Sequence, residues 1–180
     1  MKKILAIYCF LAILFINGAS GGYAQNNNSE NLGELFVSIN SDFSMYIPRG
    51  WEIVDFSVQY QVVRGPADNN FVPNLTFGVD EYSGPITEYI DQAIEVISVF
   101  YTEFKILQRG NFITNSGYQG EIIIIQGNIG NMGAVRQRLY CFRSTNGTSI
   151  IGITGTASAA HGGRYDVIFD ECLKTFNWLR

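Results

Sequence analysis

The sequence has 180 residues, with 12 basic and 16 acidic side chains and a formal net charge of −4 at neutral pH. This length suits one globular domain and is short for two. A mildly acidic chain without a run of basic residues is a poor candidate for binding nucleic acid or an anionic membrane, so we expect no nucleic-acid partner.

The first 24 residues have the layout of a secretory signal peptide. Lys2 and Lys3 precede an apolar run over residues 4–16, and small residues follow it up to Ala24. The run is shorter than the roughly 20 residues that span a bilayer, which favours a cleaved leader over a retained anchor. We therefore expect residues 1–24 to be a signal peptide, with no stable membrane insertion after cleavage. The protein would be exported, either periplasmic or secreted, and its formal charge would change from −4 to −6.

Two segments remain after the leader. Residues 25–34 (QNNNSENLGE) are polar and lack apolar periodicity, which predicts a flexible lead-in. Residues 35–180 would form one domain. Its richness in Ile, Phe, Tyr and Gly favours a compact, sheet-rich fold that needs no metal.

Two short strands open the expected domain, at residues 34–39 and 43–48. Apolar side chains occupy every second position of the second segment, FSMYI, which is the period of a half-buried strand. Pro48 cannot donate to a sheet ladder, so it ends this strand. Gly50 permits a turn, and we expect Trp51 to pack beside the strand just completed.

Extended segments and one helix follow. Strands are expected at residues 51–56, 60–65 and 74–82. Residues 84–101 carry apolar side chains three and four positions apart, which predicts an amphipathic helix with Pro85 in its first turn.

The rest of the chain predicts a sheet with helices on both faces. Four strands are expected, at residues 104–112, 118–129, 134–142 and 149–156, and a final helix at residues 164–179. Residues 122–125 are all isoleucine, and a strand that is apolar on both faces is covered from both sides. We therefore predict an α+β domain, an α/β/α sandwich whose central, mainly antiparallel sheet is flanked by helices.

The stretch FSMYIPRGW, the order of the elements and the ending TFNW resemble the PsbP-like family. Its wider relatives include DcrB-like lipoproteins and a Ran-binding import factor. The resemblance covers nearly all of the expected mature chain and implies the α/β/α sandwich. Proteins of this fold are mainly non-enzymatic binding or accessory proteins. No residue here maps onto the docking or ion-binding positions of the photosynthetic members.

His161 is the single histidine and the first candidate for chemistry. It could act as a base or metal ligand near Asp166 and Asp170, or lie in a loop ahead of the last helix. One histidine falls short of the usual spacing of a metal site. The two aspartates are four positions apart, with Lys174 four further on, which favours a solvated and partly paired helix surface. We expect no catalytic residue, no metal ligand and no cofactor.

Residues 134–142 hold the candidate partner-binding face. Under strict alternation Arg136, Arg138, Tyr140 and Phe142 share one face of the strand. An exposed arginine–aromatic face would suit a protein partner, because Arg and Tyr are enriched where interfaces bind tightly. The alternative is a sheet surface on which these side chains stack.

Two cysteines remain after the leader, Cys141 and Cys172. An even number in an exported protein permits one disulfide. The alternative is two buried free thiols, because cysteine packs as a small hydrophobic residue. The sequence leaves both open.

The leading hypothesis for function is an exported, non-enzymatic accessory or binding protein of the bacterial cell envelope. It would be a monomer that acts through contacts with an unidentified envelope protein. The alternative is a periplasmic carrier of a small molecule or lipid, since the aromatic and isoleucine content could line a pocket, although a filled core explains the same content. A third hypothesis is an enzyme that uses His161 and nearby carboxylates.

Overall fold

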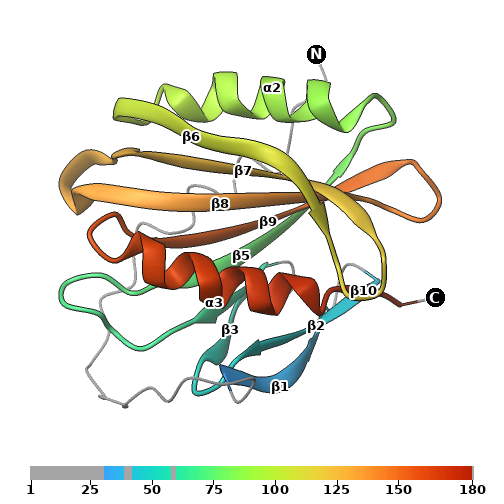
Figure 1. Ribbon diagram of the computed structural model, residues 1–180, viewed down its shortest axis with the longest axis horizontal. Helices are drawn as coiled ribbons and strands as arrows, with labels where there is room; N and C mark the ends of the chain where they lie inside the picture. Colours follow the sequence, from blue (N-terminus) through green and yellow to red (C-terminus); the bar gives the residue numbers. More distant parts are fainter. Residues whose placement is uncertain (1–30, 39–41, 58–59, 180) are drawn as a thin grey trace.

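Figure 1 shows a computed structural model of the chain, in which residues 31–38, 42–57 and 60–179 are described. The expected signal peptide and most of the expected lead-in lie outside these residues. The described strands form two sheets. The larger one has seven strands, in the order β3 (Glu52–Ser57), β4 (Tyr60–Arg64), β5 (Asn74–Glu81), β9 (Ser149–Ser158), β8 (Ala134–Arg143), β7 (Gln119–Asn128) and β6 (Thr102–Ile113). Every neighbouring pair in it is antiparallel.

The smaller sheet brings both ends of the described chain together. Its order is β1 (Leu32–Val37), β2 (Phe43–Pro48) and β10 (Asn177–Trp178), again all antiparallel. The described residues also form two helices, α2 (Ile86–Ser98) and α3 (Gly162–Lys174), and a short 3₁₀ helix, η3 (Gly130–Met132), joins β7 to β8. Neither α2 nor α3 is long and apolar enough to cross a membrane.

The two helices pack against opposite faces of the seven-stranded sheet. Successive residues of a strand point to opposite faces, and the side chains of β7 and β8 divide in this way between two clusters. The α2 cluster contains Ile123, Ile125, Leu139 and Cys141 with Tyr89, Ile90 and Ile97 of the helix. The α3 cluster contains Ile122, Tyr140 and Phe142 with Phe169, Cys172 and Leu173 of the helix. The isoleucine run is therefore buried on both faces, as predicted.

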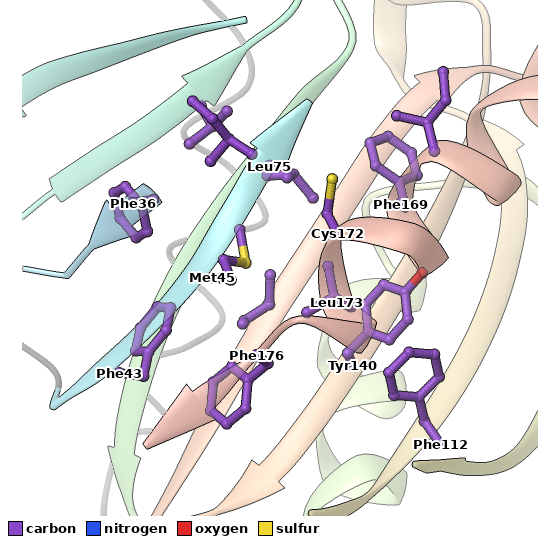
Figure 2. Close-up of a cluster of buried hydrophobic side chains, with 14 of the residues drawn as sticks. Phe36, Phe43, Met45, Leu75, Phe112, Tyr140, Phe169, Cys172, Leu173 and Phe176 are labelled. Carbon is purple, nitrogen blue, oxygen red and sulfur yellow. The ribbon is translucent and has the colours of Figure 1, made fainter. Parts of the chain in front are cut away.

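The smaller sheet shares the face of α3. Phe36, Phe43, Met45 and Ile47 join the α3 cluster, and Figure 2 shows the first three of them among its buried side chains. The prediction had a single sheet, and the turn after β2 explains the difference. The Trp51 amide donates to the Pro48 carbonyl at 3.1 Å, and Gly50 has a φ of 78°. This turn directs the chain out of the small sheet, so β3 joins the larger one.

Three predicted boundaries are corrected. β1 begins at Leu32, so the end of the expected lead-in belongs to the domain. Gly33 allows the start of β1 to lie close to the backbone of Arg49, because a Cβ there would be only 3.0 Å from the Cα of Arg49. The middle helix ends at Ser98, before residue 101, and the last one ends at Lys174. The segment after α3 leaves the helix because Phe176 is fully buried and the next residues pair with β2 as β10.

Candidate functional site

The expected partner-binding face is covered by α3, so the prediction of an exposed face was wrong. Arg138, Tyr140 and Phe142 are 6%, 0% and 1% exposed. They do share one face of β8 with Arg136, as alternation predicted. That face contacts the helix, and its members hold the helix to the sheet.

A network of ion pairs and hydrogen bonds joins this face to α3. Arg138 donates to both carboxylate oxygens of Asp170 at 2.6 Å, and its Nη1 lies 3.1 Å from Asp166. Arg136 donates to Asp166, with Nη2 at 2.5 Å from Oδ2. The Tyr140 hydroxyl donates to Asp170 at 2.7 Å and accepts from Arg138 at 2.9 Å. The two aspartates therefore point to the sheet, which corrects the expected solvated surface.

The spacing of the arginines along β8 nearly equals that of the aspartates along α3, which explains why they pair. Residues four apart on a helix are separated by about 6 Å along its axis. Residues two apart on a strand are separated by about 6.6 Å. Asp166 and Asp170 can therefore face Arg136 and Arg138 one to one.

Burial and charge oppose each other in this network. Burial lowers the pKa of Arg138, but Tyr140 and Asp170 act in the other direction, and the pKa ends above its usual range. Burial is also the main reason why the pKa of Tyr140 is raised, against the opposing effect of Arg138. At neutral pH the arginine is therefore charged and the tyrosine is protonated, so the hydrogen bonds of the network are retained.

His161 lies next to Asp68 in the β4–β5 loop. Its Nδ1 is 2.8 Å from Oδ2 of Asp68, and the Tyr165 hydroxyl donates to the same oxygen at 3.1 Å. Asp166 and Asp170, its expected neighbours, pair with arginines instead. Asp68 is 93 positions away in the chain, so no local pattern could have indicated it. The contacts tie the loop to the start of α3, and no cluster of metal-binding side chains occurs among the described residues.

The two cysteines are free and lie in different clusters. Cys141 belongs to the α2 cluster and Cys172 to the α3 cluster, with the sheet between them. The candidate disulfide is therefore absent, and the alternative of two buried thiols holds. Burial raises the pKa of both thiols far above the usual value, so neither has the thiolate character of a reactive cysteine.

An exposed apolar surface lies on the outer side of the smaller sheet. Leu35, Val37 and Tyr46 are 51%, 48% and 46% exposed, and Leu35 is directly opposite Tyr46 across β1 and β2. We call these three residues the outer patch. β1 is the last strand of its sheet among the described residues, so one edge of its backbone has no strand partner there. Sequence reasoning missed the patch because Leu35, Phe36 and Val37 are three consecutive apolar residues, a pattern that does not show which face of the strand is buried.

Comparisons with known proteins identify the fold. No protein-family model and no curated protein matches the sequence. Among solved structures, cyanobacterial PsbP (CyanoP) of Synechocystis sp. PCC 6803 is 12% identical, with a TM-score of 0.61 over 89% of this chain and 98% of that one. The Ran-binding protein Mog1p of Saccharomyces cerevisiae is 10% identical, with a TM-score of 0.59 over 82% and 96%. LpqN of Mycobacterium tuberculosis, described as involved in cell envelope biogenesis, is 11% identical, with a TM-score of 0.57 over 77% and 83%.

The chain has the PsbP-like fold. Identities of 10% to 12% show the fold alone. Within this PsbP-like fold, the polar residues that the sequence singled out hold α3 and the β4–β5 loop in place. The outer patch is a feature of the surface, and it can contact another molecule without any rearrangement of the core.

Proposed function

We propose that the protein is an exported, non-enzymatic accessory protein of the bacterial cell envelope that acts through contacts with a partner protein. The outer patch is the observation that carries this proposal. About half of each of its three residues is exposed, although all three belong to regular strands. Two neighbours in fold support it. LpqN is described as involved in cell envelope biogenesis, and Mog1p is described as a Ran-binding protein.

The partner would present an extended segment to β1. A strand at the edge of a sheet has a row of backbone groups that can pair with another strand. Leu35 and Val37 stand on the same side of β1 and would give the added segment apolar contacts. Glu34 of β1 and Asp42, which directly precedes β2, are exposed. Together with the net negative charge, they favour a partner segment that carries basic residues.

The test is crosslinking of the tagged, exported protein in cells, followed by mass spectrometry. A double variant, Leu35→Lys with Val37→Lys, places two charges on the patch and repels a basic segment. The matched control is Val167→Lys on α3, which is 57% exposed and lies outside the patch. We expect one repeatable partner with the wild type and the control, and its loss with the double variant. Capture of the same partner by the double variant, or no repeatable partner at all, would refute the proposal.

A further inference from the structure

The backbone of β1 directs hydrogen-bonding groups outward at two residues, Leu35 and Val37. The Ser38 amide donates to the Phe43 carbonyl at 3.1 Å, so the backbone groups of Ser38 point to β2. Backbone groups alternate in direction from one residue of a strand to the next. Those of Leu35 and Val37 therefore point away from β2. The amide of Tyr46, opposite Leu35, agrees with this, because it donates at 2.9 Å to a threonine hydroxyl on the far side of β2.

The same two residues carry the exposed apolar side chains of the strand. Leu35 and Val37 are 51% and 48% exposed, whereas Phe36 between them is 1% exposed and belongs to the core. Figure 1 shows β1 at the rim of the fold, on the side of β2 away from β10. A strand that pairs with this edge therefore also covers two apolar side chains.

This edge is complementary to itself about a two-fold axis through Phe36. When two β1 strands pair antiparallel with Phe36 opposite Phe36, Leu35 of each copy is opposite Val37 of the other. Glu34 is then opposite Ser38, so no like charges face each other. Leu35 and Val37 both direct their backbone groups to the opposing strand, as a hydrogen-bonded antiparallel pair requires. Each exposed apolar side chain meets an apolar one.

We propose that β1 pairs in this way with β1 of a second copy of the chain. The pairing joins the two smaller sheets into one continuous sheet and covers Leu35 and Val37 of the outer patch. It replaces the monomer expected from the sequence. The edge is short and buries less than a standard interface, so the dimer forms at high concentration and dissociates on dilution. A partner protein would compete with the second copy for β1. This competition rests on the proposed function, whereas the pairing itself does not.

Disulfide trapping tests the register. In the proposed dimer the Cα atoms of Leu35 and the opposing Val37 are roughly 5.5 Å apart, a distance that a disulfide bridges. The two copies of Leu35 are roughly 8–9 Å apart, which is too far. A mixture of the Leu35→Cys and Val37→Cys variants should therefore give at least threefold more disulfide-linked dimer on mild oxidation than either variant alone. The native cysteines, Cys141 and Cys172, are buried and contribute little background. Equal yields from the mixture and the single variants overturn the proposal.

Sedimentation velocity of the purified exported protein tests the dimer without any trapping. We expect the average mass of the wild type and of the exposed control Val167→Lys to rise with concentration. The double variant Leu35→Lys with Val37→Lys should remain a monomer, because lysines replace both members of each apolar pair. A wild type that stays monomeric at the highest concentration, or a double variant that dimerises equally, overturns the proposal. Such a result leaves the capture of an envelope partner in cells unaffected, so the two proposals fail separately.

Discussion

Replacement of Arg138 by methionine should destabilise the fold strongly, because it leaves Asp170 without its charged partner and removes one of the two arginines beside Asp166. The Arg138 side chain is 7% exposed, while those of Asp166 and Asp170 are 15% and 33% exposed. Removing one member of a buried ion pair costs about 3–5 kcal/mol. Because solvent screens a carboxylate that is one-third exposed, we expect a loss of about 2–3 kcal/mol in the free energy of unfolding.

Urea denaturation at neutral pH measures this loss, and thermal melting should show a decrease in Tm of roughly 5–10 °C. Arg109→Met is the matched control. Arg109 also lies 2.6 Å from an aspartate, Asp91, but their side chains are 34% and 63% exposed. An exposed pair contributes about 0–1 kcal/mol. If Arg138→Met costs no more than Arg109→Met, the network does not hold α3 to the sheet and the reasoning fails.

Two further predictions concern burial. With Cys141 and Cys172 protonated in the folded state because burial raises their pKa, unfolding releases protons above the ordinary thiol pKa of about 8.5. Below that pH the protonated thiols keep their full contribution to the free energy of unfolding. Above it, this contribution falls by up to about 1.4 kcal/mol per pH unit for each thiol. Urea titrations from pH 7 to 10 check this, and a double Cys→Ala variant should show a smaller decrease. Gly155→Ala should cost about 1–3 kcal/mol, since its Cβ would lie 2.6 Å from the Phe169 ring, whereas Gly110→Ala meets no atom within 4 Å and should change stability little.

Strand β8 shows how far the sequence could lead. Alternation correctly placed Arg138 and Tyr140 on one face, and helical spacing correctly placed Asp166 and Asp170 on one side of α3. The error was to expect the arginine face of β8 and the aspartate side of α3 to be exposed to solvent. Each pattern fixes which residues lie together on an element, but it contains nothing about which other element they contact.

The cysteines also show the difference between what a pattern within one element predicts and what the packing of two elements decides. Cys141 alternates with Tyr140, so it had to point away from the arginine face of β8. Cys172 lies on the side of its helix that faces the sheet. The disulfide is excluded only once α3 is known to pack on the arginine face, because the two thiols then lie on opposite sides of the sheet.

The sequence by itself determined most of the helices and strands, because hydrophobic periodicity and turn residues act over a few positions. It also predicted that helices cover both faces, through the isoleucine run of β7. The tertiary structure alone decided the contacts between distant segments: Asp68 with His161, the pairing of β10 with β2 and the exposure of Leu35. These depend on how whole elements pack to bury the most apolar area, and that free energy is a property of the complete fold.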